Sequence, residues 1–500
     1  MSGPTSLLLV TVDCLRADHT GFMGYSQPTT PFLDRLAGES MVFPKAIAAG
    51  APTYYSFPGV LASRSPLALG REVVGIAPGE PTLATVLQQA GYRTAAYVAA
   101  NPYLSSRFGY AQGFDAFQNF LSHELPRHGA GQEQTESVPR GRTRFNRHLA
   151  ELAHRVGPLG RLYDDLYFQY CQRIGASKPE SWDRLRRFPA ADVLVDRACD
   201  WLGSLGQQPF FLWLHFMDPH APYYPPAEAL KAMGAERTRP ERGRYLNAAW
   251  NRSDLGVERL RKYRDEIVRL HDAGIRWVDT QLARLVDVLR NLSLWDSSVF
   301  VLTADHGEEF LDHGGRFHSP SRAYQEMLHV PLLMRVPGVK TKPLSDAPFS
   351  HVHLAPTVLD AIGIDAPPEF EGRSCWAEAQ RGGDWEWAVS ESIGRCTNPM
   401  DARKRMGGTV LVVQERRYKL ALDFDRNQEE LFDLESDPGE LRALPPEAEK
   451  SARARLLRKA LQHLERRASG FNRDLAIRAR VHEVGLEWKH SKMHSKTLAS

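Results

Sequence analysis

The sequence repeats one pattern, in which a short apolar run ends in polar side chains that are suited to chemistry. Four such runs cover residues 7–11, 94–99, 210–216 and 298–303. Runs of this length and composition are typical of strands that are buried in a parallel sheet. Segments with a helical spacing of apolar residues lie between the runs, and the longest covers residues 257–289. The alternation predicts an α/β fold, in which helices flank a mostly parallel sheet.

The polar side chains that follow these runs are the candidate site residues. The carboxyl ends of parallel strands meet at one edge of the sheet, where open α/β folds bind their ligands. We therefore expect the polar residues at these ends to lie close together. They are Asp13, Cys14, Arg16 and Asp18 after the first run, Asn101 after the second, His215, Asp218 and His220 at the end of the third, and Asp305 and His306 after the fourth.

Three of these residues can converge on one metal ion. Asp13, Asp305 and His306 offer carboxylate oxygens and an imidazole nitrogen, a mixed set that suits Ca²⁺, Mg²⁺, Mn²⁺ or Zn²⁺ without choosing among them. Taken alone, Asp13 is better interpreted as a cap of the turn after its strand, but the Asp-His pair after another strand favours the metal. A two-metal site is an alternative, and its added ligands would be Asp218, His313 and His318.

Thr53 stands where a new helix is expected to begin, because Gly50 and Pro52 break the preceding element. Free backbone N–H groups and the helix dipole both favour negative charge at such a position. A hydroxyl there is well placed to act on an anionic group. The alternative interpretation is that Thr53 or Ser56 serves only as a helix cap.

The charge balance gives nucleic-acid binding no support, because 63 basic and 60 acidic residues leave a net charge of only +3. The five cysteines are scattered without the paired spacing of a metal site, so reduced thiols in a cytosol are expected. Residues 7–12 are too short for the core of a signal peptide, and no run approaches the roughly 20 apolar residues that span a membrane. We therefore expect a cytoplasmic protein without a membrane span, and the sequence leaves its oligomeric state open.

The length and composition are those of a globular protein with one large domain or two fused domains. The chain has 500 residues, of which 42% are hydrophobic and 25% are charged. Residues 120–190 interrupt the strand-helix alternation and are expected to form a mostly helical, polar insertion. Residues 228–256 are polar and rich in arginine, and we expect a loop insertion there.

The pattern of predicted elements changes at about residue 378. Short strand-like segments joined by turns follow, and then a basic helix over about residues 448–467. We expect a catalytic domain over residues 1–377, a smaller subdomain with an antiparallel sheet and a terminal helix over residues 378–470, and a tail over residues 471–500.

Seven segments, taken in order, resemble the sulfatase family of the alkaline phosphatase superfamily over about residues 5–445. They are VTVDCLRADHTGFMGY, TTPFLDRLA, TLATVLQQAGYRTAAYVAANPYL, PFFLWLHFMDPHAPYYPP, TADHGEEFLDHG, LHVPLLMRVPG and YKLALDFDRNQEELFDLESDPGE. The resemblance implies an alkaline-phosphatase-like α/β/α sandwich with a smaller C-terminal domain. It also implies a hydrolase of sulfate esters, in a family whose relatives act on phosphate and phosphonate esters, so the expected substrate is a small-molecule, saccharide or lipid ester.

The resemblance assigns roles to individual residues. One divalent metal ion, Ca²⁺ in this family, would be held by Asp13, Thr53, Asp305 and His306, and Thr53 would be the nucleophile. The remaining expected contacts are those of His215, His220 and His318 with the ester oxygens or the leaving group, and those of Asn101 and Arg16 with the substrate.

This sequence departs from the family pattern around the nucleophile. Typical members carry a Cys or Ser that is converted to formylglycine, with Pro or Ala two residues later and Arg four residues later. Here Thr53 is followed by Tyr55 and Phe57 at those positions, so no formylglycine is expected. Cys14 replaces the usual second acidic ligand, and Asn101 lies near the position of a family lysine.

These features favour in-line displacement at sulfur or phosphorus through a covalent Thr53 ester. His220 or His318 would act as the general acid, and water would then hydrolyse the intermediate. A covalent sulfate ester of threonine is hard to hydrolyse, whereas a covalent phosphate ester is hydrolysed by attack at phosphorus. The threonine nucleophile therefore favours phosphate esters or phosphonates as substrates. The alternatives are a phosphodiesterase or phosphonate hydrolase, a phospho-group transferase, and a catalytically degenerate sulfatase-like protein.

Overall fold

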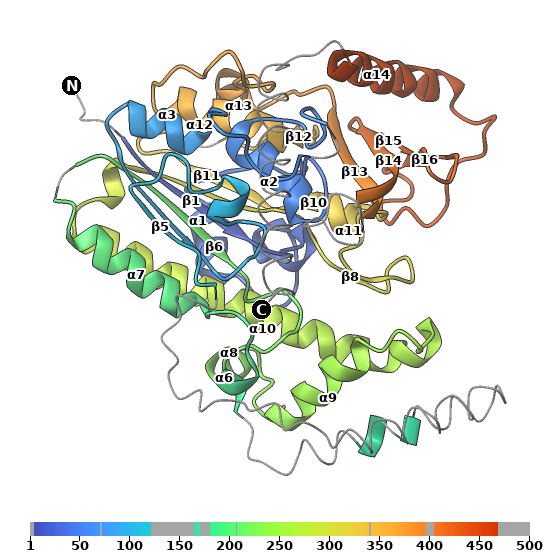
Figure 1. Ribbon diagram of the computed structural model, residues 1–500, viewed down its shortest axis with the longest axis horizontal. Coiled ribbons are helices and arrows are strands. Elements are labelled where there is room, and N and C mark those ends of the chain that lie inside the picture. The colour runs from blue at the N-terminus through green and yellow to red at the C-terminus, as the bar shows by residue number, and fades with distance from the viewer. Residues whose placement is uncertain are drawn as a thin grey trace, which may run out of the picture.

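A central sheet of seven strands organises the molecule, as the computed structural model shows (Figure 1). The model describes residues 5–70, 73–121, 165–166, 168–170, 181–206, 208–339, 342–396 and 405–468. Most of the expected insertion at 120–190 and the whole expected tail at 471–500 lie outside these residues. Within the described part of the chain, no helix is long and apolar enough to cross a membrane.

The central sheet is mostly parallel, as predicted. Its inner strands β1, β6, β4 and β7 and the edge strand β5 are parallel, whereas β11 pairs antiparallel with β7 and β2 pairs antiparallel with β11. From one edge to the other, the strands are β2 (Met41–Val42), β11 (Leu332–Arg335), β7 (Ser298–Ala304), β1 (Ser6–Val12), β6 (Phe210–Phe216), β4 (Arg93–Val98) and β5 (Ala116–Gln118).

Helices cover both faces of this sheet, which explains why its inner strands are continuous apolar runs. Every residue of β1, β6 and β7 is buried. Figure 1 shows one group of helices on each side of the sheet, so the predicted α/β/α sandwich is confirmed. One group contains α1 (Pro31–Ala37), α7 (Ala191–Gly203) and α10 (Val257–Asn291), and the other contains α2 (Thr53–Ala62), α3 (Leu83–Gln89) and α12 (Leu354–Ala361).

The register of the inner strands brings their carboxyl ends to one level. Val12 of β1 pairs with Phe216 of β6 on one side and with Ala304 of β7 on the other. The residue after each strand therefore emerges at the same edge of the sheet. This places Asp13 beside Asp305.

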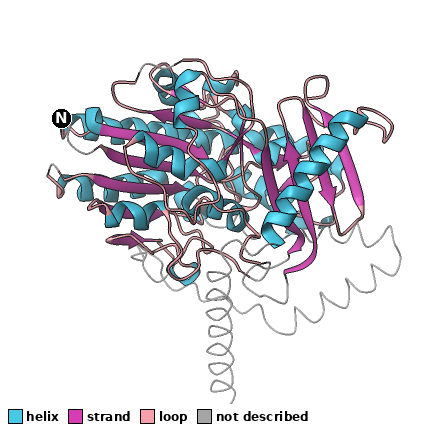
Figure 2. Cartoon of the chain, turned by 90° about the horizontal axis from the view of Figure 1, so that it is seen from above, coloured by secondary structure: helices cyan, strands magenta, loops and turns pink. Residues whose placement is uncertain are grey.

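A second, antiparallel sheet forms the C-terminal region, as predicted, and Figure 2 shows it beside the central sheet with one helix across its face. Leu411, Val413 and Leu431 of this sheet are buried against Leu456 and Ala460 of the helix. The elements are β13 (Ala388–Cys396), β14 (Arg405–Gln414), β15 (Tyr418–Asp423), β16 (Gln428–Asp433) and α14 (Lys450–Ala468). The domain boundary near residue 377 stays a prediction.

The expected loop at residues 228–256 is instead helical. Pro240 occupies the first position of one helix, where its missing N–H is no disadvantage. Leu246 and Trp250 are buried there against Leu260 and Ile267 of α10, so a few apolar contacts outweigh the polar composition. The helices of this segment are α8 (Ala227–Ala232) and α9 (Pro240–Trp250).

Residues 329–335 contribute to two sheets. Pro331 separates β10, which pairs with β3, from β11 of the central sheet. The remaining short elements are β3 (Ala46–Ile47), β8 (Glu309–Phe310), β9 (Arg316–Phe317), β10 (His329–Val330), β12 (Phe349–Ser350), α6 (Trp182–Leu185), α11 (Gln325–Leu328) and α13 (Trp376–Arg381).

Candidate active site

Asp13, Thr53, Asp305 and His306 surround one point at the carboxyl edge of the sheet. Asp13 follows β1, Asp305 and His306 follow β7, and Thr53 is the first residue of α2. The Oγ1 atom of Thr53 lies 3.2 Å from His306 Nε2 and 3.4 Å from Asp13 Oδ2. His306 Nε2 in turn lies 3.4 Å from Asp305 Oδ2 and 3.7 Å from Asp13 Oδ1. The sheet and α2 thus bring together four side chains that are far apart in the sequence.

This cluster fits a divalent cation. Its donors are carboxylate and hydroxyl oxygens with one imidazole nitrogen, a set that hard and borderline metals accept. The Oδ2 atom of Asp305 is fully buried and has no hydrogen-bond partner among the described residues. His306 Nδ1 contacts the carbonyl of Gly307 at 2.8 Å, which leaves Nε2 facing the cluster, as metal-binding histidines usually do. A bound cation would satisfy the buried oxygen.

The electrostatics of the cluster follow from its burial. Burial tends to raise the pKa of Asp13, but His220, His215 and His306 outweigh it, and the pKa falls well below its usual value. Burial and the Asp13 carboxylate raise the pKa of Asp305 to about 8. Burial and the neighbouring His318 lower the pKa of His306 to about 4, so its imidazole is neutral and free to bind a metal.

A buried network that the sequence did not reveal orients His215. His215 Nε2 lies 3.4 Å from Asp13 Oδ2, and its Nδ1 lies 3.0 Å from the hydroxyl of Thr11. Trp213 donates its indole N–H to the same hydroxyl at 2.9 Å. Trp213 stands two residues before His215 on β6, and Thr11 pairs with His215 across the two strands, so the three side chains share one face of the sheet.

Asn101 and Arg16, which we expected to bind substrate, make contacts within the protein. Asn101 donates its amide to Asp13 Oδ2 at 2.9 Å and therefore holds that carboxylate in place. Arg16 donates to both oxygens of Asp18, to both oxygens of Asp312 and to the carbonyl of Glu308. These five bonds use all five N–H donors of the guanidinium. Arg16 thus connects the loops around the site, and its expected role in substrate binding stays a prediction.

Further side chains beside the cluster form a hydrogen-bonded group of their own, which consists of His318, Glu308 and Tyr223. His318 Nδ1 lies 3.0 Å from Glu308 Oε1, and Tyr223 donates its hydroxyl to Glu308 Oε2 at 3.0 Å. Burial tends to lower the pKa of His318, but Glu308 raises it to about 9. The ring of His318 lies 4.7 Å from that of His306, between centroids. A protonated imidazole therefore stands beside Thr53 and its partners, supported by a glutamate that the sequence did not single out.

His220 lies across from His318, with 4.9 Å between the ring centroids. Its Nδ1 contacts the carbonyl of Ala221 at 2.5 Å, and burial lowers its pKa, so the imidazole is neutral. The Nδ1–H donates to that carbonyl, which leaves Nε2 as an acceptor. His220 therefore has the tautomer of a ligand or a base and not of a proton donor.

The added ligands of the two-metal alternative make their contacts elsewhere, apart from His318. Asp218 accepts a bond from the backbone N–H of Ala191 at 3.2 Å. His313 lies 2.7 Å from Glu326 through Nδ1 and bonds a backbone carbonyl through Nε2. The contacts of His313 thus do not support that ligand set, whereas Asp218 keeps one buried oxygen, Oδ2, without a hydrogen-bond partner among the described residues.

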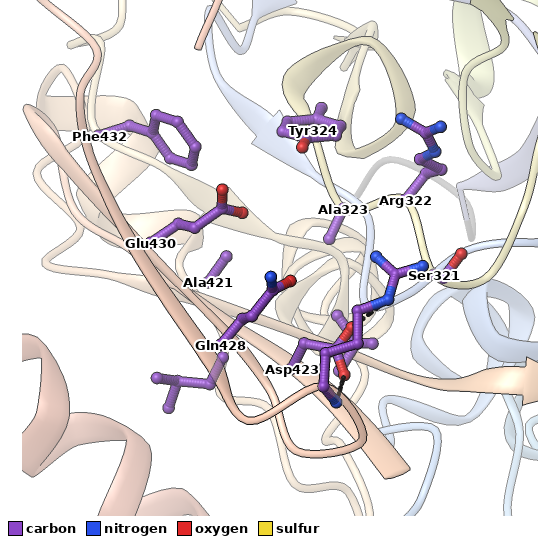
Figure 3. A pocket seen from close by; sticks show the side chains of 12 residues that line it. Ser321, Arg322, Ala323, Tyr324, Ala421, Asp423, Gln428, Glu430 and Phe432 are labelled. Carbon is purple, nitrogen blue, oxygen red and sulfur yellow. Dashed lines mark hydrogen bonds and ion pairs between the residues drawn. The ribbon is translucent and has the colours of Figure 1, made fainter. Parts of the chain in front are cut away.

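A pocket of about 150 Å³ opens between the loop that follows His318 and the C-terminal sheet (Figure 3). Tyr324 and Phe432 lie near one another at one side of it, with 6.3 Å between their ring centroids. Glu430 and Gln428 of β16 line another side. The pocket therefore combines aromatic faces with side chains that donate and accept hydrogen bonds.

Comparisons with known proteins agree over most of the chain. A family model described as Sulfatase matches residues 5–364, and one described as N-sulphoglucosamine sulphohydrolase, C-terminal, matches residues 315–467. An arylsulfatase of Clostridium perfringens is 24% identical over 493 residues, which cover 93% of this chain and 95% of that protein.

Solved structures share the fold. A protein in complex with its substrate D-glucosamine-2-N,6-O-disulfate aligns with a TM-score of 0.66 and 17% identity, over 93% of this chain and 98% of that chain. The phosphonate monoester hydrolase of Agrobacterium radiobacter aligns with a TM-score of 0.61 and 19% identity, over 93% of this chain and 96% of that chain. At such identities the likeness extends to the fold, and function has to be argued from the site.

Proposed function

This chain belongs to the sulfatase family and is a hydrolase acting on ester bonds, and we propose that it cleaves sulfate or phosphate esters with Thr53 as its nucleophile. The convergence of Thr53 with Asp13, Asp305 and His306 carries this proposal. Thr53 opens α2, so the N-terminal end of that helix faces the ester and favours its negative charge.

Asp13, Thr53, Asp305 and His306 would hold a divalent cation. When bound, such an ion favours the alkoxide form of a ligated hydroxyl and offsets charge on an ester oxygen. Calcium is the ion that the family resemblance implies. The imidazole of His306 shifts the preference toward Mn²⁺ or Zn²⁺, because Ca²⁺ takes oxygen ligands.

His318 supplies the proton for the leaving group. Glu308 stabilises its imidazolium form at neutral pH, whereas His220 is neutral. Attack by the Thr53 oxygen, in the alkoxide form that a bound cation would favour, forms a bond to sulfur or phosphorus, and the bond to the leaving oxygen breaks as that oxygen takes the proton from His318. The neutral imidazole that remains can accept a proton from water, whose oxygen then displaces Thr53 as an alkoxide, so both groups return to their starting forms.

The hydroxyl nucleophile favours phosphorus over sulfur. A covalent phosphate ester is hydrolysed when water attacks phosphorus, whereas a covalent sulfate ester of an ordinary alcohol is hydrolysed more slowly. A panel of aryl sulfate, aryl phosphate, phosphate diester and phosphonate monoester substrates tests this order. We expect higher kcat/KM for one of the phosphorus substrates. Faster turnover of the sulfate would reverse the assignment, and no turnover by metal-loaded protein would support the catalytically degenerate alternative.

The pocket of Figure 3 is a candidate site for the leaving group, and a saccharide ring fits its chemistry. The rings of Tyr324 and Phe432 can pack against the C–H face of a sugar, and Glu430 and Gln428 can bond its hydroxyls. The loop that forms one wall begins directly after His318.

The proposal predicts that a substitution in the pocket affects KM for a saccharide ester but not for a small aryl ester. Glu430→Ala should raise KM for a saccharide ester by about tenfold, the effect of one or two lost hydrogen bonds, and leave a small aryl ester unaffected. The exposed Glu429 is the neighbour on the same strand, and Glu429→Ala is the matched control. Equal effects on both substrates would contradict a leaving-group role.

A further inference from the structure

The thiol of Cys14 lies among metal-binding side chains beside the nucleophile. Its Sγ lies 3.1 Å from Asp13 Oδ1 and 3.4 Å from His318 Nδ1. Cys14 is fully buried and adopts a left-handed backbone conformation, with φ of 59°. Its carbonyl is 3.1 Å from His271 Nε2. The end of β1 is thus held in a conformation that turns the thiol into the site.

The two oxygens of Asp13 have different nearest partners. Oδ2 receives the amide of Asn101 and lies 3.4 Å from the hydroxyl of Thr53. Oδ1 lies 3.1 Å from the thiol of Cys14, and His306 Nε2 is farther from it, at 3.7 Å. A carboxylate that presents one oxygen to each of two ligand groups can bridge two neighbouring cations, an arrangement that two-metal hydrolases use.

His220 completes this group of ligand atoms. One ligand atom each of Asp13, Cys14 and His220 lies within 4.8 Å of the others. In a tetrahedral zinc site, bonds of about 2.3 Å to sulfur and 2.0 Å to nitrogen separate these two ligands by roughly 3.5 Å. The group is therefore near the dimensions of a metal site before any side chain moves. The Nδ1 of His220 is bonded to a carbonyl, which directs Nε2 away from it and fixes that nitrogen as the ligand atom.

We propose that Cys14, His220 and Asp13 bind a second cation, one that prefers sulfur and nitrogen ligands, such as Zn²⁺ or Co²⁺. This inference rests on the proposed function, because the second ion shares Asp13 with the ion beside Thr53. Three protein ligands leave a fourth position open, as in catalytic zinc sites. The open position is available to the substrate.

The test is reconstitution of the metal-free full chain with Co²⁺, followed by metal analysis and absorption spectroscopy. A cobalt–thiolate bond gives a charge-transfer band in the near ultraviolet, which a site of oxygen and nitrogen ligands lacks. We expect two ions per chain and this band in the wild type. Cys14→Ser should keep one ion and lose the band, and Cys199→Ser, a half-buried cysteine on α7, should keep both. Asp305→Asn should lose the ion beside Thr53 and keep the band.

The outcomes separate this inference from the proposed function. One ion per chain, no thiolate band in the wild type and loss of that ion in Asp305→Asn would overturn the second site and leave the proposed function standing. No bound ion in the wild type would overturn both. The wild-type spectrum decides the question even if Cys14→Ser does not fold. Two ions in both the wild type and Cys14→Ser, with no band, would likewise overturn the role of the thiol.

Discussion

Removing the hydroxyl of Thr53 should abolish most of the activity. The hydroxyl is held 3.2 Å from His306 and 3.4 Å from Asp13, and Thr53 is only 3% exposed, so the nucleophile is already positioned. A positioned group of this kind can be equivalent to about 10⁵ M of free reactant, or roughly 7 kcal/mol. Water that enters the space left by Thr53→Ala can attack the ester directly and recover part of this. We therefore expect kcat/KM to fall by about 10³- to 10⁵-fold, which is about 4–7 kcal/mol of transition-state stabilisation.

Thr53→Ser is the matched control, because it keeps the oxygen and loses one methyl group. The lost methyl is worth about 0.8 kcal/mol, so activity should stay within about tenfold of the wild type. The assay is steady-state hydrolysis of the best substrate from the panel, with metal content measured for each variant. Mass spectrometry of acid-quenched protein should show the covalent adduct on the wild type and its absence on Thr53→Ala. If Thr53→Ala keeps more than about a tenth of the activity with its metal bound, Thr53 is not the nucleophile.

Three further predictions test the site and its support. Asp13→Asn should lower the affinity for every bound cation by more than about tenfold, as metal titration of the purified variant would show; unchanged affinity would contradict the site as described. Burial tends to lower the pKa of His313, but Glu326 raises it above 6.5, so the stabilising contact is complete below pH 6.5 and is lost as the pH rises through the raised pKa. As the pH rises from 6.5 through the raised pKa, the difference in melting temperature between wild type and His313→Gln should therefore decrease. A difference that increases with pH would refute the predicted direction. Lys419 and Glu440 form a fully buried ion pair at 2.6 Å. Lys419→Met should destabilise the protein by about 3–5 kcal/mol in chemical denaturation, and Lys419→Met with Glu440→Gln should restore most of the loss; no recovery in the double variant would show that the cost does not come from an unpaired charge.

The sequence predicted best those parts of the fold in which local pattern and burial agree. The runs at 7–11 and 298–303 are buried on both faces, so their composition alone indicates inner strands, and the ends of such strands identify Asp13 and Asp305. The helix at 240–250 was harder to predict, because its buried face has few apolar residues and gains stability by packing against α10, the next helix in the chain.

Side-chain partners were the least predictable part of the site. Glu308, Trp213 and Thr11 matter through contacts with residues that lie elsewhere in the chain, and Thr11 meets His215 across 204 positions of sequence. Arg16 shows a related difficulty. The family resemblance implies a substrate contact, whereas its guanidinium donates to Asp18, two residues away, and to Asp312, which becomes a neighbour only after folding.

The placement of the reactive groups and of the pocket on two different sheets has a consequence for the evolution of this chain. Asp13, Asp305 and Thr53 are anchored to the central sheet and its helix, whereas Glu430 and Gln428 belong to an outer strand of the C-terminal sheet. Substitutions on that strand can therefore accumulate without moving the reactive groups. Selection for a new leaving group could act on one sheet while the other preserves the chemistry, so paralogues of this protein should differ most in β14–β16 and least at the ends of β1 and β7.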